Sequence, residues 1–431
     1  MTPAEQAFAE QLADGRPGGE PAFVRALREA GRETFLRVML PTQKHEDWRF
    51  TSLAALSARR LGEVAPPPAG ALPLELPSPP RLVFWNGHVD VRRTDLSGLP
   101  QGVRAGSLAA ALRERPGAIE PLLGRLVGAR DHAFGALNDA LFRDGAFLEL
   151  GDGTDCERPI HLVFVTTAAE PAAWHPRSLL VVGQGARGTV VESYRGQGLY
   201  LVNAVTEVAL AEGASLEHDR IQEDDPGAFH MGRVEVAQSA ASRWKGQSVA
   251  LGAALARVEV RVLLRGEEAA CDVHGLYVGA GRQVLDHLVH VDHASPRCAS
   301  REIFKGILDG ASRGVFAGRV HVRPGAQKTD ASQVSSNLLL SDDAVADSRP
   351  QLEILADDVK CSHGGTVGQL GEEQLFYLRS RGVPEALARA LLTWAFASEM
   401  VERVGPAEVR RRVRDAVRAR LPGGELLMEA A

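Results

Sequence analysis

The sequence predicts a mainly β protein with helical segments at both ends. Between about residues 145 and 370, short runs of alternating or β-branched residues recur at close intervals, separated by clusters of Gly, Asp and Ser. No amphipathic stretch of helix length interrupts them, so βαβ units are not expected. The segment is long for one sandwich. The pattern alone slightly favours a solenoid of stacked coils, with a sandwich or two β domains as alternatives.

The N-terminal segment, 1–144, is predicted to be a mostly helical domain. Apolar residues repeat at helical spacing from Phe23 to Val38, and helical patterns return from Ser107 to about residue 143. Seven of the fifteen residues at 66–80 are proline, which predicts a linker. Asn86-Gly87, between two short apolar runs, predicts a hairpin turn.

The β core is expected at 145–370 and a C-terminal helical domain at 371–431. Proline occupies a first-turn position at Pro384, and an apolar stripe continues from Leu387 to Val404. This stripe predicts a helix that packs on the body of the protein, with a partner surface as the alternative. A basic amphipathic helix follows it.

The composition of the chain excludes several classes of protein. The formal net charge is −6, which gives no general attraction to nucleic acid. No apolar run approaches the roughly 18 residues that span a bilayer. Four cysteines in 431 residues do not form a disulfide scaffold. We therefore expect a soluble, cytoplasmic protein. No Gly-Lys dipeptide is present, which excludes a P-loop.

Two glycine motifs resemble enzyme signatures. Gly183–Gly188 fits a dinucleotide fingerprint, but a β-branched run follows where that motif requires a helix, so a turn between strands is expected. Ser312 lies in a G-x-S-x-G pattern, which leaves a hydrolase as an alternative function. The residues after Ser312 also look like a strand, and this disfavours the hydrolase.

Cysteine and histidine residues with metal-ligand character gather in three places, which are Cys271 with His274, the run His287, His290, His293 and Cys298, and Cys361 with His363. On a strand, alternate residues share a face, so His287 and His293 should face away from His290. The middle group is interpreted as structural, with a self-contained metal protein as the alternative. Cys361 and His363 should share a face and are a candidate soft-metal or sulfur-handling site.

Six phrases of the sequence follow one another in a recognisable order, namely Pro41–Thr51, Gln327–Ala331, Asn337–Ser341, Pro350–Ile354, Ala356–Gly364 and Leu375–Gly382. Together they resemble the SufB/SufD family of iron–sulfur cluster assembly proteins. The strong match covers about 285–404, and the N-terminal phrase is separate from it. Cys361–Gly364, Thr366–Leu370 and Leu421–Gly424 are most similar to the SufD branch.

This resemblance implies a right-handed parallel β-helix flanked by N- and C-terminal helical domains. It also implies a scaffold, not an enzyme, in a complex with a SufB-like subunit and the ATPase SufC. A nascent iron–sulfur cluster would be held in that complex, with no cofactor bound stably by this chain alone. A homodimer of the isolated chain remains an alternative.

The resemblance further implies roles for individual residues. His363 matches the histidine that helps hold the nascent cluster, and Cys361 is the neighbouring cysteine. The C-terminal helices match the region that docks SufC, and within them Tyr377, Trp394 and Phe396 are the candidate contacts.

Overall fold

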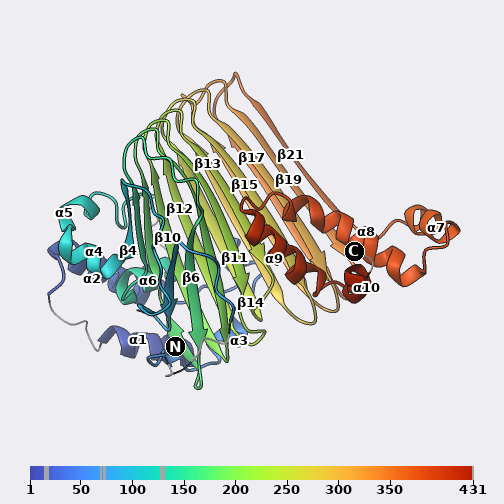
Figure 1. Cartoon of the computed structure of the whole chain (residues 1–431), viewed down its shortest axis with the longest axis horizontal. Coiled ribbons are helices and arrows are strands. Elements are labelled where there is room, and N and C mark those ends of the chain that lie inside the picture. Colours follow the sequence, from blue (N-terminus) through green and yellow to red (C-terminus); the bar gives the residue numbers. More distant parts are fainter. Residues whose placement is uncertain (14–18, 68–69, 71–73, 127–131, 430–431) are drawn as a thin grey trace.

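The chain forms a β-solenoid with helices at both ends, which confirms the expected fold class (Figure 1). The computed structural model describes residues 1–429 except 14–18, 68–69, 71–73 and 127–131. Its core consists of two sheets of eleven and ten strands, called here sheet A and sheet B. From β8 to β21, successive strands alternate between the sheets, and from β10 onward each strand pairs in parallel with the strand two places earlier.

Sheet A ends at β20 and sheet B ends at β21. The strands of sheet A are β1 (Gly62–Glu63), β4 (Val103–Ser107), β5 (Ala146–Leu150), β7 (Ala172–Trp174), β8 (Arg177–Val182), β10 (Tyr200–Leu210), β12 (Phe229–Gln238), β14 (Leu255–Leu264), β16 (Val284–His293), β18 (Arg313–Val322) and β20 (Val345–Ile354). Those of sheet B are β2 (Arg81–Trp85), β3 (His88–Val89), β6 (Ile160–Thr167), β9 (Arg187–Gln197), β11 (Ser215–Glu223), β13 (Arg243–Ala250), β15 (Ala270–Gly279), β17 (Ala299–Leu308), β19 (Asp330–Leu339) and β21 (Lys360–Gly368).

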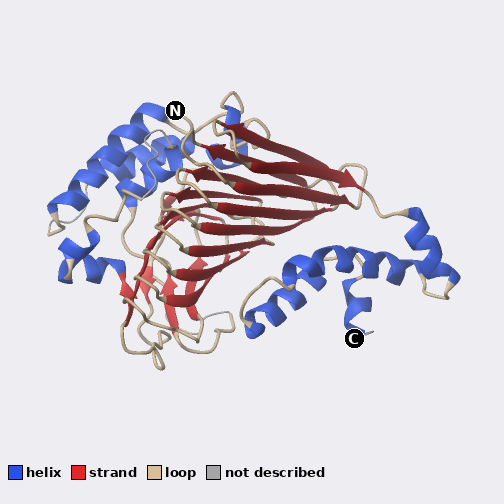
Figure 2. Cartoon of the chain, turned by 90° about the horizontal axis from the view of Figure 1, so that it is seen from above, coloured by secondary structure: helices blue, strands red, loops and turns tan. Residues whose placement is uncertain are grey.

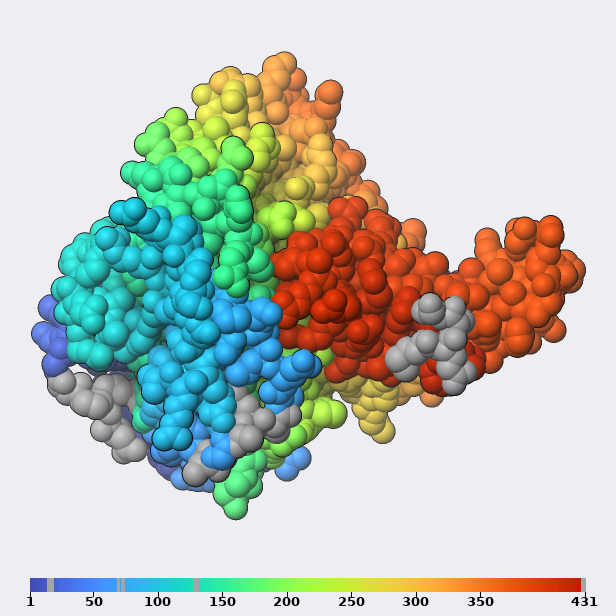
Figure 3. Space-filling view, viewed as in Figure 1, coloured from blue at the N-terminus to red at the C-terminus, as the bar shows by residue number. Residues whose placement is uncertain are grey.

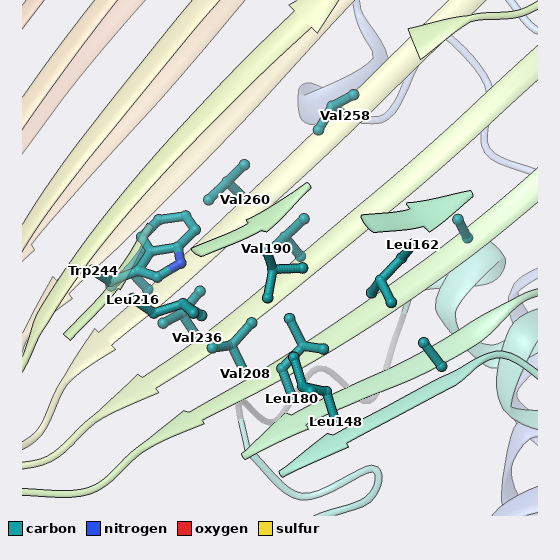
Figure 4. Packing of buried hydrophobic residues seen from close by; sticks show 14 of the residues in the cluster. Leu148, Leu162, Leu180, Val190, Val208, Leu216, Val236, Trp244, Val258 and Val260 are labelled. Carbon is teal, nitrogen blue, oxygen red and sulfur yellow. The ribbon is translucent and has the colours of Figure 1, made fainter. Parts of the chain in front are cut away.

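Apolar side chains from both sheets meet between them and form the main core (Figure 4). In-register pairing stacks similar side chains on one another. Phe84, Phe164 and Tyr194 are register partners on β2, β6 and β9. Phe164 lies between the other two rings at centroid distances of 5.2 and 4.8 Å. This aromatic stack joins a strand of the N-terminal segment to the solenoid.

The predicted hairpin is present, and its two strands, β2 and β3, pair antiparallel across Asn86 and Gly87. Both turn residues have positive φ, as a two-residue hairpin turn requires. The described residues of 66–80 contain no helix or strand. The strands β2 and β4 pair with β6 and β5, so each sheet begins with strands from before residue 145.

The N-terminal helices lie along the outer face of sheet A (Figure 2). They are α1 (Pro3–Ala13), α2 (Ala22–Val38), the 3-10 turn Glu46–Trp48, α3 (Ala54–Ser57), α4 (Leu108–Glu114), α5 (Pro116–Ile119) and α6 (Ala133–Leu141). The helical pattern expected from Ser107 to about residue 143 is broken after α5, which ends at Ile119 and is followed by turns as far as residue 126. Pro121 disfavours helix at the residue before it, and Gly124 has a φ of +71°.

The C-terminal helices lie on the opposite side, where the helices of residues 385–418 pack along sheet B (Figure 2). They are α7 (Glu372–Ser380), α8 (Glu385–Val401), α9 (Ala407–Arg418) and α10 (Gly424–Glu429). The predicted apolar stripe of α8 packs on the body of the protein: Ala397, Met400 and Val401 are buried against outward-facing residues of sheet B. Among the described residues, no helix is long and apolar enough to cross a bilayer.

We predict that Phe164→Ala destabilises the fold by about 3–5 kcal/mol, because it removes the central ring of a closed aromatic stack and leaves a cavity. Urea denaturation measures this change. Val91→Ala is the control, since Val91 is 79% exposed and should shift the midpoint little. Equal stability of the two variants would contradict the role given to the stack.

Candidate functional site

The solenoid is open at its C-terminal end, where β20 and β21 each have one edge without a strand partner among the described residues (Figure 1). Such an edge exposes backbone N–H and C=O groups that can pair with another chain. Large apolar side chains are also exposed around this end, namely Val345, Ile354, Leu355 and Val367. The end therefore combines free backbone hydrogen-bonding groups with apolar surface.

Cys361 and His363 both lie on β21 at this open end. Their register partners on β19, Ala331 and Gln333, are buried inside the solenoid. Cys361 and His363 therefore face the interior side of the end layer. His363 is exposed because no further coil covers it, whereas Cys361 is half-buried against a small apolar cluster. Partial burial raises the pKa of the Cys361 thiol, so a metal ion would have to displace its proton.

A row of polar side chains continues inward from His363. Its register partner Gln333 pairs in turn with Glu302 on β17. Gln333 Nε2 donates to Glu302 Oε2 over 2.5 Å, and both side chains are fully buried. Burial raises the pKa of Glu302 to about 7. The row thus places a titratable carboxyl group two strands behind the histidine.

Aromatic rings lie deeper in the solenoid than the end layer. The rings of Phe304 and Phe316 are 4.6 Å apart, and His287 lies 5.4 Å from Phe304. All three side chains are buried.

In the end layer itself, a Cβ on Gly365 would come within 3.4 Å of Ser348 Oγ, so β20 and β21 approach one another across the interior.

The middle histidines do not form a common site. His287 and His293 are buried inside the solenoid, and His293 Nε2 lies 2.9 Å from Ser300 Oγ. His290 is on the outer side of the same strand, so the expected alternation is confirmed. Cys271 is inside, whereas His274 faces α8 and lies 3.5 Å from Arg403. Within the described ranges, no group of three potential ligands is close enough to hold a metal ion.

The two glycine motifs are turns between strands. Gly183–Ala186 connects β8 to β9, and the motif ends inside β9 at Gly188, so no helix N-terminus is available for a pyrophosphate. Ser312 connects β17 to β18, is fully buried, and its Oγ has no hydrogen-bond partner in the described part of the chain. A nucleophile elbow needs an exposed serine between a strand and a helix, so this geometry does not support the hydrolase.

The three candidate contact residues for SufC differ in exposure. Tyr377 is 58% exposed on α7, which extends away from the body of the molecule (Figure 3). Trp394 and Phe396 on α8 are half-buried, each covered by a cation within the chain: Arg418 lies over Trp394 and Lys305 over Phe396. The structure thus separates an exposed aromatic site on α7 from two internally packed rings on α8.

Phe376 was missed by the sequence analysis and is 72% exposed beside Tyr377. Adjacent side chains on a helix point in different directions, so the sequence alone suggests that only one of the two rings, Phe376 or Tyr377, is exposed. The composition of α7, EEQLFYLRS, could have indicated this exposure. The helix has few apolar residues besides Leu375 and these two rings, so it offers little apolar surface for packing on the body of the protein.

We predict that Glu302→Gln removes a pH dependence of stability. An unfolded glutamate releases its proton near pH 4.5, whereas folded Glu302 keeps it to about pH 7. The folded state therefore loses stability as pH rises between these values. The free energy of unfolding of the variant, measured relative to that of wild type, should therefore increase by on the order of 3 kcal/mol between pH 4.5 and pH 8.

Urea denaturation at the two pH values measures this gain. The control is Glu373→Gln, which changes an exposed carboxyl group on α7. A wild-type-to-variant difference that is the same at both pH values would show that Glu302 is ionised in the folded protein.

Comparison with known proteins identifies the family to which the chain is similar. A family model described as SUF system FeS cluster assembly, SufBD core domain, matches residues 164–396, and a SufBD protein N-terminal region model matches 80–162. An iron–sulfur cluster assembly SufBD family protein of Synechocystis is 34% identical, over 94% of this chain and 92% of its own length. The iron–sulfur cluster assembly protein SufD of Escherichia coli is 30% identical, over 91% of this chain and 92% of its own.

A chloroplastic protein of Arabidopsis thaliana, ABCI7, is 29% identical over 96% of this chain and 90% of its own length. The matches span both the helical N-terminal segment and the solenoid. Because the core model alone covers more than half of the residues, the chain belongs to the SufB/SufD family of iron–sulfur cluster assembly proteins.

Proposed function

We propose that this chain is a SufD-type scaffold subunit of a cytoplasmic SufBCD-type complex. It helps assemble nascent iron–sulfur clusters and hand them on, and it is not itself an enzyme. The observation that carries the proposal is the open end of the solenoid, where His363 and Cys361 lie beside two strand edges that are free to pair with another subunit. The similarity to SufD over most of the chain supports the same function.

The SufB-like subunit docks on the edges of β20 and β21. Pairing there satisfies the backbone groups that the last coil leaves free and covers the apolar side chains around it, including Val367, which is 51% exposed. In the isolated chain, the same edges can pair with a second copy, which would form a homodimer. In both cases the contact encloses the end layer that carries His363.

The nascent cluster is cargo at this interface. His363 supplies an imidazole nitrogen, a ligand that suits iron, and Cys361 is the secondary ligand or a structural thiol. One or two ligands from this chain leave the remaining positions to the SufB-like subunit. Incomplete ligation from each side allows the cluster to leave, whereas four cysteines on one chain would hold it firmly.

The ATPase SufC docks on the C-terminal helices. Since this chain has no P-loop, nucleotide hydrolysis has to come from such a partner. Tyr377 on α7 is the most exposed of the three candidate contacts, and the newly found Phe376 extends the same surface. Exposed aromatic residues are strong anchors in protein interfaces. Trp394 and Phe396 contribute mainly by holding α8 against the body of the protein.

We predict that His363→Ala abolishes cluster assembly, while the fold and the binding of both partners persist, because the exposed imidazole contributes ligation and little packing. Cys361→Ala should have a milder effect. Complementation of a SufD-deficient strain under iron starvation measures assembly, and a sizing column measures complex integrity.

The matched control is His88→Ala, which removes an exposed histidine of the β2–β3 hairpin. Cys156→Ala, Cys271→Ala and Cys298→Ala should retain activity. Full activity of the His363→Ala complex would refute the role of this histidine and would leave the scaffold function without a known ligand on this subunit.

We also predict that the double variant Phe376→Asp, Tyr377→Asp loses SufC binding by at least about tenfold, because charge replaces exposed aromatic anchors. Val91→Asp, an exposed site on the N-terminal side, is the control. Pull-down of SufC and calorimetry measure binding, and circular dichroism checks the fold. Undiminished binding by the double variant would move the docking site away from α7.

A further inference from the structure

A groove of about 990 Å³, part of it open to solvent, lies on the outer face of sheet A. One wall is the segment around Pro41 and His45, which belongs to the N-terminal phrase that the proposed function leaves without a role. His132 lines it on one side, and Arg261 and Arg319 contribute from the sheet. The C-terminal helices pack on sheet B, so this groove is separate from the proposed SufC surface (Figure 2).

The two arginines belong to a row of cationic and imidazole side chains. Arg261 on β14 is the register partner of His290 on β16, which is the partner of Arg319 on β18. Neighbouring strands are about 4.8 Å apart, so the two arginines flank the histidine at about 10 Å from one another. The two guanidinium groups are close enough to repel one another, and an anion between them would relieve that repulsion.

The carboxylates near this row already have other partners. Glu259 Oε2 lies 2.7 Å from His132 Nε2. Glu46 and Asp47, on the wall of the groove, lie 3.2 and 3.6 Å from the guanidinium nitrogens of Arg349. Glu235, the register partner of Arg261 on β12, lies 2.5 Å from Arg233 Nε. Each of these four carboxylates therefore already has a partner other than Arg261 and Arg319.

The arginines of the row, in contrast, have spare donors. In the described part of the chain, Arg261 has no carboxylate within ion-pair distance, and its Nε is buried without a hydrogen-bond partner. Arg319 bonds only weakly to Gln351 Oε1, at 3.4 Å. Burial and the nearby Arg233 lower the pKa of Arg261, and the charges of Glu259, Glu235 and Asp47 offset this shift only in part.

His290 complements the two guanidinium groups. Burial, followed by the charges of Arg261 and Arg319, lowers the pKa of His290 to about 4. The imidazole is therefore neutral at physiological pH, and it can still donate one N–H. Two guanidinium forks and one neutral donor in a row match a compact oxyanion that carries more than one negative charge.

We propose that Arg261 and Arg319, with His290 between them, bind a phosphate-like oxyanion in this groove. A monovalent carboxylate would neutralise only one guanidinium group, whereas a phosphate dianion can contact both. The groove leaves room beside the anion for the rest of a small phosphorylated molecule. Free phosphate and a phosphomonoester both carry the oxyanion that these residues recognise. The proposed oxyanion site is separate from the cluster site at His363.

Calorimetric titration of the full chain with inorganic phosphate, in a phosphate-free buffer at low salt, tests this proposal. We expect saturable binding that weakens at least about tenfold in the double variant Arg261→Gln, Arg319→Gln. The matched control is Arg313→Gln, because Arg313 is on the same face of β18 but pairs with Asp347 at 3.0 Å. It should bind phosphate as wild type does.

Glycerol 3-phosphate and succinate are the comparison ligands. Tighter binding of glycerol 3-phosphate than of phosphate identifies a phosphorylated metabolite as the source of the anion, and equal binding identifies free phosphate. Succinate that binds as well as phosphate would overturn the proposal. So would a wild-type chain that binds no phosphate at about 20 mM, or a double variant that binds it unchanged.

Thermal unfolding separates a binding role from a structural one. Since Arg261 is half-buried and its Nε has no hydrogen-bond partner among the described residues, Arg261→Gln should keep or raise the midpoint in the absence of phosphate. Phosphate should then raise the midpoint of wild type and of Arg313→Gln, but not that of Arg261→Gln. A variant that is destabilised without phosphate, or that fails to fold, would show that Arg261 serves the fold and would overturn the proposal.

Discussion

In-register parallel pairing between every second strand is the constraint on which the rest of this structure depends. It places each side chain directly beside its partner in the neighbouring coil, so rows of related side chains cross the sheets. The aromatic stack of Phe84, Phe164 and Tyr194 is one such row. A row of this kind stabilises the fold when its members are apolar, and it concentrates charge when they are cationic.

The same pairing also creates the candidate site. A solenoid of this kind cannot close on itself, so its last coil keeps two strand edges without partners among the described residues. On β21, side chains that elsewhere would be buried reach the surface. His363 is the outermost member of a row that continues inward through Gln333 and Glu302. The end of the fold and the proposed function therefore have one physical origin.

Features set by local periodicity could be predicted from the sequence. The opposite faces of His287 and His290 follow from the two-residue repeat of a strand, and the hairpin at Asn86 follows from turn chemistry. Contacts between coils could not be predicted, because no fixed repeat length in the sequence aligns one coil with the next. Register alone shows that Gln333 lies behind His363 and that His290 lies between two arginines.

Hydrogen–deuterium exchange of the chain, alone and with a SufB-like subunit, tests the central claim that the open end is the docking surface. The account predicts that amides of β20 and β21 become strongly protected on binding, because alternate N–H groups of each strand point to the free edge and gain partners there. Amides of the N-terminal helices should not change. Binding that leaves β21 unprotected, while another surface becomes protected, would contradict the account.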